Sequence, residues 1–277
     1  MTRDRLRRIR NWQSSEFYAR LVMRPLAILV MLVVADWRWL TPNLVTTLGN
    51  GAKLLGAALI AIDHREYAVA AAVAIQVGLL LDHLDGTIAR YRNCGTMFGA
   101  FYDKVSDAVT WLAITGAIGW AAYVDTGDAR LPIAAVASAY SLLALGYMKW
   151  IVVAEQKKAD WLDAMRMRDR TRRARLAEAE AAPVSHEPPS RTAKQWAVWL
   201  GSSVLRAFKF EEVDLFFWIG LGLVLRELTL LCLLLVVSQI VQLVIMVIKR
   251  ALEARALDVR RVRLADADDA DATRRAA

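Results

Sequence analysis

Residues 66–90 read EYAVAAAVAIQVGLLLDHLDGTIAR. No charged side chain occurs between Ala68 and Leu81, and two aspartates, Asp82 and Asp85, follow directly. A helix needs about 20 mainly apolar residues to cross the hydrocarbon core of a bilayer. This stretch therefore predicts a membrane-spanning helix whose end carries two carboxylates. Ionisable side chains within such spans are costly to place there and indicate functional sites.

The composition of the whole chain also favours a membrane protein. Of its 277 residues, 57% are hydrophobic and 23% are charged, and the charged residues concentrate between long apolar stretches. Two cysteines and three histidines are too few to indicate a disulfide framework or a zinc site. The formal net charge is +8, but the basic residues flank apolar spans, so we expect a membrane lipid environment and no nucleic-acid partner.

We expect an all-α integral membrane protein with six transmembrane helices. Their approximate ranges are Leu44–Ile62, Glu66–Leu84, Met97–Val124, Leu131–Ala154, Ser203–Leu225 and Thr229–Ile248. The apolar run Pro25–Val34 is too short to span comfortably and precedes the cluster Asp36-Trp37-Arg38-Trp39. This pattern favours an N-terminal helix lying at the membrane interface.

These spans divide the chain into five parts. We expect residues 1–40 to form a basic segment with the interfacial helix, 41–155 a core of four spans that holds the functional site, and 156–202 a charged cytoplasmic segment with a linker. Residues 203–250 contain the last two spans, and 251–277 a charged tail that we expect to be disordered.

Counts of lysine and arginine predict the topology. The first 24 residues hold seven, the segment 155–210 holds twelve and the chain from Lys249 onward holds eight. The three loops expected on the opposite side hold one each, Arg65, Arg130 and Arg226. Because short basic flanks stay in the cytoplasm, we expect a multi-pass protein of the cytoplasmic (inner) membrane with both termini inside.

A second pair of carboxylates, Asp103 and Asp107, lies at the start of the third predicted span. Spacings of three and four residues place each pair on one helix face, and the short link between the spans lets the two faces meet near the cytoplasmic side. Oxygen ligands without histidine or cysteine select hard ions such as Mg²⁺ or Mn²⁺. Two such ions suit phosphoryl transfer, although a helix-packing network or a cation or proton pathway would also use buried carboxylates.

Other residues near the carboxylates suit a phosphorylated ligand. Gly86, Ala89 and Gly99 would let a nucleotide or a neighbouring helix approach the backbone closely. Arg90 and Lys104 supply positive charge for phosphate oxygens, although Lys104 could equally pair with Asp107 three residues on.

The segment Asp82-His83-Leu84-Asp85-Gly86-Thr87-Ile88-Ala89-Arg90, followed by Gly99, Asp103 and Asp107, resembles a known family. Every fixed position matches the D-x2-DG-x2-AR-x8-G-x3-D-x3-D signature of the CDP-alcohol phosphotransferases. The family transfers a substituted phosphate from a CDP-linked alcohol to the hydroxyl of an acceptor alcohol and releases CMP. The resemblance therefore implies a membrane transferase of phospholipid biosynthesis.

The resemblance also implies roles for individual residues. Two Mg²⁺ or Mn²⁺ ions would be held by the four aspartates, and Asp107 would also be the general base. The CDP-linked donor would contact residues that match the family's donor positions, namely Asn43, Thr46, Gly86, Arg90 and Thr96. Many members carry an arginine where this chain has Gly49, and Lys53, one turn further on, is a candidate for the missing phosphate contact.

Donor and acceptor stay open at this stage. The donor could be CDP-diacylglycerol or a polar CDP-alcohol such as CDP-inositol, and the acceptor a small alcohol or alcohol phosphate. The stretch Phe17-Tyr18-Ala19-Arg20 is similar to polar-donor and inositol-phosphate-linked members, and the resemblance implies a homodimer. The rival hypotheses are a membrane cation or proton transporter that uses the same carboxylates, and a catalytically silent scaffold.

Overall fold

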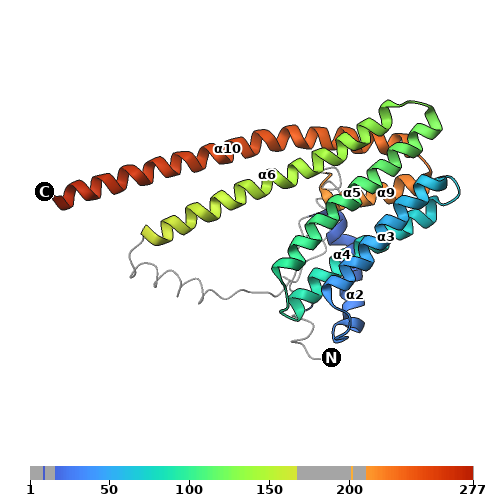
Figure 1. Cartoon of the computed structure of the whole chain (residues 1–277), viewed down its shortest axis with the longest axis horizontal. Helices are drawn as coiled ribbons and strands as arrows, with labels where there is room; N and C mark the ends of the chain where they lie inside the picture. Colours follow the sequence, from blue (N-terminus) through green and yellow to red (C-terminus); the bar gives the residue numbers. More distant parts are fainter. Residues whose placement is uncertain (1–8, 10–15, 167–200, 202–209, 277) are drawn as a thin grey trace. The chain divides into compact units, whose positions relative to one another are not determined.

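The computed structural model describes residues 9, 16–166, 201 and 210–276, and all regular structure within these residues is helical (Figure 1). The all-α prediction is therefore confirmed for the part of the chain that is described. The elements, in chain order, are the π-helix η1 (Ala19–Met23) and the α-helices α2 (Arg24–Val34), α3 (Pro42–Asp63), α4 (Ala68–Tyr91), α5 (Met97–Thr126), α6 (Arg130–Arg166), α9 (Glu212–Leu225) and α10 (Leu228–Ala276).

Five of these helices are long and apolar enough to cross a membrane: α3, α4, α5, α6 and α10. Only 28 to 50% of each apolar window is buried inside the protein, so many apolar side chains face outward, as a lipid environment permits. The predicted span 203–225 lies partly outside the described residues. Its described remainder, α9, has 14 residues, so a sixth span stays a prediction. Helix α2 matches the predicted range closely, but its place at the interface likewise stays a prediction.

The chain divides into two compact units. The first comprises Met1–Tyr140 and His186–Ile240, and the second comprises Ser141–Ser185 and Val241–Ala277. Within the first unit α3 packs against α4 and α5, and α4 also packs against α2 and α9. The predicted site residues all belong to this first unit, so its helix packing alone positions them.

The described residues of the second unit are the C-terminal parts of α6 and α10. The helix α6 continues to Arg166, beyond the predicted end of the fourth span, and α10 continues to Ala276. The segment from residue 251, which we expected to be disordered, is thus helical in the structure. Its content of alanine, arginine and leucine explains the difference, because these residues have high helix propensity.

Helices α3 and α4 approach each other through glycines. A Cβ atom added to Gly78 would lie 2.7 Å from the backbone oxygen of Gly49, and one added to Gly56 would lie 2.5 Å from the Ile75 side chain. Small residues at such spacing let helix backbones approach closely in membranes. This contact fixes the register of α3 against the part of α4 that precedes Asp82.

A tight turn joins α4 to α5. Asn93 adopts a left-handed conformation with φ of 52°, which is typical of the residue that follows a helix, and Cys94 N donates to Ala89 O at 3.0 Å. The Thr96 side chain then caps α5 by accepting a hydrogen bond from Gly99 N at 3.0 Å. The chain therefore reverses within a few residues, which brings the start of α5 beside the end of α4.

The short helix α2 is held against the end of α4. Met31 and Val34 of α2 share a buried cluster with Leu84 and Ile88 of α4. The Arg92 guanidinium donates to backbone oxygens at and just after the C-terminus of α2, those of Ala35 at 3.0 Å, Trp37 at 2.8 Å and Leu40 at 2.7 Å. Carbonyls at a helix C-terminus have no partner within the helix, so this arginine supplies one and fastens α2 beside the site.

Candidate active site

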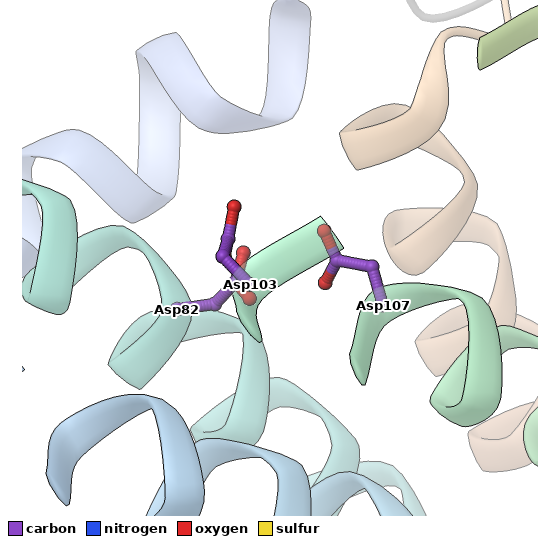
Figure 2. A group of neighbouring side chains, drawn as sticks. All are labelled: Asp82, Asp103 and Asp107. Atoms are coloured by element: carbon purple, nitrogen blue, oxygen red, sulfur yellow. The ribbon is translucent and has the colours of Figure 1, made fainter. Parts of the chain in front are cut away.

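Three of the four predicted carboxylates form one group. Asp82 comes from α4, Asp103 and Asp107 come from α5, and one carboxylate oxygen of each lies within 4.8 Å of those of the other two (Figure 2). The three side chains are partly exposed, between 15 and 31%. The expectation that carboxylates from the two helices converge agrees with this geometry.

Asp85 lies on α4 one turn beyond Asp82 but is outside that group. Its buried carboxylate accepts short hydrogen bonds from Thr46 Oγ1 and from Gly86 N, one on each oxygen. Thr46, predicted as a donor-binding residue, thus orients a predicted metal ligand in this structure. Asp85 also lines the cavity described below, so its carboxylate faces the same space as Asp103.

Two lysines offset part of the negative charge of the carboxylate group. Lys53 of α3 donates from Nζ to Asp82 Oδ1 at 2.8 Å and to Asp107 Oδ1 at 3.3 Å, and its side chain is only 2% exposed. Lys104 of α5 lies 3.2 Å from Asp103 Oδ2 and 3.1 Å from Asp107 Oδ2, and is 55% exposed. Of the two expectations for Lys104, the structure shows the pair with Asp107. Lys53 also contacts carboxylates rather than open space.

A cavity of about 490 Å³ adjoins the carboxylates. Its lining includes every residue predicted to contact the donor, contributed by α3, α4, the connecting turn and α5: Asn43, Thr46, Gly86, Ala89, Arg90, Thr96 and Gly99. Asp85 and Asp103 line it as well. The cavity is therefore bounded on one side by carboxylates and on the others by small residues, hydroxyl groups and one guanidinium.

Gly49 and His83 both lie close to the predicted site but pack within the protein. A Cβ atom on Gly49 would lie 3.1 Å from Gly78 O and 3.2 Å from Leu81 Cβ, so α4 occupies the space that an arginine side chain would need. His83 is buried and its Nδ1 lies 3.0 Å from Leu79 O, which agrees with a packing role rather than metal ligation.

Three features near the site were not predicted. Asn50 lies between Thr46 and Lys53 on the same face of α3, and its buried Nδ2 has no hydrogen-bond partner among the described residues. Glu212, at the start of α9, interacts electrostatically with Asp107 and both lysines. Arg92 fastens α2, as described above. The spacing of Asn50 from Thr46 could have indicated its face, whereas no local signal connects Glu212 with the site.

The donor set fits a hard divalent ion. Among the described residues the group consists of carboxylate oxygens alone, and such oxygens are the ligands that Mg²⁺ and Mn²⁺ prefer. The lysines pair with single oxygens, so Asp82 and Asp103 each keep one oxygen outside these pairs. An acidic cluster that can bind a divalent metal is thus present.

Comparison with known proteins agrees with the signature. Residues 39–174 match the model of the CDP-alcohol phosphatidyltransferase family, a family of membrane-bound enzymes that use a divalent metal. The resemblance carried by residues 82–107 is confirmed.

Curated relatives in this family are named phosphatidylinositol phosphate synthase. The protein of Mycobacterium tuberculosis (strain CDC 1551 / Oshkosh) is 35% identical over 111 residues, which cover 40% of this chain and 50% of the relative. That of Mycobacterium marinum is 32% identical over 110 residues, covering 40% and 46%. That of Corynebacterium glutamicum is 34% identical over 102 residues, covering 37% and 43%. The matched part thus spans about half the length of these relatives.

A crystal structure of Mycobacterium tuberculosis phosphatidylinositol phosphate synthase with CDP-DAG bound is also similar. It is 22% identical, the match covers 80% of this chain and 93% of that one, and the TM-score is 0.37.

Proposed function

We propose that this protein is a CDP-alcohol phosphotransferase, which transfers a substituted phosphate from a CDP-linked alcohol to the hydroxyl of an acceptor alcohol and releases CMP. The observation that carries the proposal is the cavity of about 490 Å³, which joins the predicted donor residues to Asp85 and Asp103. A ligand in this cavity would place its phosphates beside the carboxylate group. The family match favours this function over the transporter hypothesis.

In this proposal the cavity binds the CDP portion of the donor. Arg90 lines the cavity and carries the positive charge that suits a diphosphate oxygen. Gly86 and Gly99 line it without side chains, so a nucleotide can approach the backbones of α4 and α5. Asn43 and Thr96 add polar groups from two other sides. These contacts would orient the donor relative to the aspartates.

Asp82, Asp85, Asp103 and Asp107 are proposed to hold Mg²⁺ or Mn²⁺, and the resemblance implies two ions per site. Bound ions would polarise the diphosphate and stabilise the leaving phosphate. Asp107 is the proposed general base, because its Oδ1 is paired with the buried Lys53 whereas its Oδ2 is paired with the half-exposed Lys104. If Lys104 turns toward a phosphate, Asp107 Oδ2 is freed to take the proton of the acceptor hydroxyl.

The names of the relatives narrow the substrates. Making phosphatidylinositol phosphate with release of CMP requires a donor that carries the phosphatidyl group, so we favour CDP-diacylglycerol over CDP-inositol as donor. The same names favour an inositol phosphate as acceptor. We also propose that the site and both termini face the cytoplasm, because the basic residues concentrate in the segments predicted on that side. The family resemblance leads us to propose a homodimer.

The test is CMP release by the purified full chain in detergent. CDP-diacylglycerol and CDP-inositol are each offered with glycerol 3-phosphate, inositol, inositol phosphate and serine, with Mg²⁺ and after treatment with EDTA. We expect metal-dependent CMP release with CDP-diacylglycerol and inositol phosphate, lowered by about 10²- to 10⁴-fold in Asp107→Asn. Absence of CMP release in every combination, together with absence of CDP binding by calorimetry, would refute the proposed function.

A further inference from the structure

Lys53 is an unusual residue at a carboxylate site for divalent ions. Its ammonium group bridges Asp82 and Asp107, at 2.8 and 3.3 Å, although these two carboxylates belong to different helices. The ammonium therefore occupies the position from which a cation binds both. The sequence had suggested Lys53 only as a phosphate contact.

The surroundings of Lys53 hold it in this position. Its side chain is 2% exposed, so its charge is almost completely shielded from water. The stem passes α4 at Gly78, where even an added Cβ atom would lie 2.6 Å from Lys53 Cγ. On the other side, Nζ lies 5.7 Å from the centre of the Phe216 ring of α9, a favourable cation–π distance. Because a buried ammonium is stable only with carboxylate partners, Lys53 stays paired with Asp82 and Asp107.

Lys104 differs from Lys53 in this respect. It is 55% exposed and can leave its two partners for solvent or a substrate phosphate. The exposed lysine can therefore give way when an ion binds, whereas the buried lysine cannot. A divalent ion placed between Asp82 and Asp107 would meet the fixed ammonium a few ångströms away, and the repulsion between the two charges would be strong.

The remaining carboxylates point to the same conclusion. The described residues contain one group of acidic side chains with oxygens within 4.8 Å of one another, and Asp85 is not part of it. Both Asp85 oxygens already accept hydrogen bonds, from Thr46 and Gly86. The group that Lys53 bridges is thus the one acidic cluster of this kind among the described residues.

We propose that the Lys53 ammonium takes the place of one of the two divalent ions that the resemblance implies, so that a single divalent ion completes the site. The inference rests on the proposed function, since that function requires the carboxylates to bind metal. Lys53 would be a positioning residue. It would hold Asp82 and Asp107 together by a fixed positive charge and leave the rest of the group to one exchangeable ion.

The test is the number of Mn²⁺ ions bound by the purified full chain, measured by calorimetry and by electron paramagnetic resonance, which detects magnetic coupling between adjacent Mn²⁺ ions. We expect one uncoupled ion per chain for the native sequence. Lys53→Met keeps a side chain of similar length without the charge, and should bind two coupled ions. Lys53→Arg keeps the charge and should bind one.

Two coupled ions in the native protein would overturn the proposal, and so would a single ion in a folded Lys53→Met variant. Circular dichroism and size-exclusion chromatography establish whether the Lys53→Met variant is folded. If it is unfolded, the number of Mn²⁺ ions bound by the native protein alone tests the proposal. A native protein that binds no Mn²⁺ and releases no CMP would instead refute the proposed function. Normal CMP release with two ions would refute only the role of Lys53.

Discussion

The contact between α3 and α4 at Gly78 predicts a strong effect from the addition of one methyl group. In Gly78→Ala the new Cβ would lie 2.6 Å from Lys53 Cγ, 2.7 Å from Gly49 O and 3.0 Å from Lys53 N, whereas ordinary contacts begin at 3.4 Å. Two of these three atoms belong to the backbone of α3, so no rotamer change relieves the overlap. The two helices must separate by up to about 0.7 Å at this point.

This separation has two measurable costs. Overpacking of this kind destabilises by about 1–3 kcal/mol, partly offset by about 1 kcal/mol from the higher helix propensity of alanine, so we expect a net loss of up to about 2 kcal/mol. The shift also moves Lys53 relative to Asp82, and misplacement approaching 1 Å lowers activity by about 10- to 100-fold. The assays are unfolding by sodium dodecyl sulfate in mixed micelles, followed by circular dichroism, and the rate of CMP release.

A matched control lies on α3 itself. Gly51 is exposed and an added Cβ would meet nothing within 4 Å, so Gly51→Ala should stabilise the protein by about 0.5–1 kcal/mol and leave CMP release unchanged. If Gly78→Ala matched Gly51→Ala in stability and activity, the reasoning that backbone contact at Gly78 positions the site would be wrong.

Three further substitutions test separate parts of the structure. Asp107→Asn should lower kcat for CMP release by about 10²- to 10⁴-fold, because the general base is lost. CMP binding, measured by calorimetry, should be unchanged, because Asp107 is not a proposed nucleotide contact. Loss of both CMP release and CMP binding would contradict the role of Asp107 as general base. Arg92→Met should destabilise by about 1.5–3 kcal/mol in the micelle unfolding assay, since charged hydrogen bonds to the end of α2 are lost. The exposed Arg130→Met is its control and should change stability little. Tyr18→Phe removes the hydrogen bond from the Tyr18 hydroxyl to Gln76 Oε1, 2.9 Å long, and should cost about 0.5–1.5 kcal/mol; an unchanged unfolding midpoint would show that this bond does not anchor the N-terminal segment.

Much of the fold could be predicted from the sequence because a membrane-spanning helix needs about 20 consecutive, mainly apolar residues, and such stretches are visible in the sequence. Four of the six predicted spans correspond to α3, α4, α5 and α6, and the last corresponds to the start of α10. The helix ends were less predictable. Helix α4 runs seven residues beyond the predicted Leu84, since the signature residues 85–90 continue the helix after the apolar run has ended. Tertiary packing supports this extension, since Leu84 and Ile88 pack against α2, and the helix ends just before Asn93 adopts its left-handed conformation; hydropathy measures neither.

The composition of the site was predictable for a different reason. The residues of the signature are adjacent in sequence or one helical turn apart, so helical periodicity alone places Asp82, Gly86 and Ala89 on one face, and the turn at Asn93 brings the α5 residues opposite. Contacts from α3 and α9 could not be inferred in this way. These contacts depend on how separate helices pack, which residue spacing within one helix does not predict. They are the pairing of Lys53 with Asp82 and the electrostatic interaction of Glu212 with Asp107.

Helix packing and the chemistry of the site are therefore coupled through α3. Gly49 and Gly56 bring α3 close to α4, and Lys53 lies between them on the same face, where its stem fits only because position 78 has no side chain. The close approach that stabilises the helix pair thus also buries a positive charge between two carboxylates. A side chain at position 78 would push α3 away from α4 by up to about 0.7 Å and would loosen the contacts that hold Lys53 between Asp82 and Asp107. A loosened lysine would yield to an ion more readily, so the number of ions at the site should depend on a glycine that touches none of them.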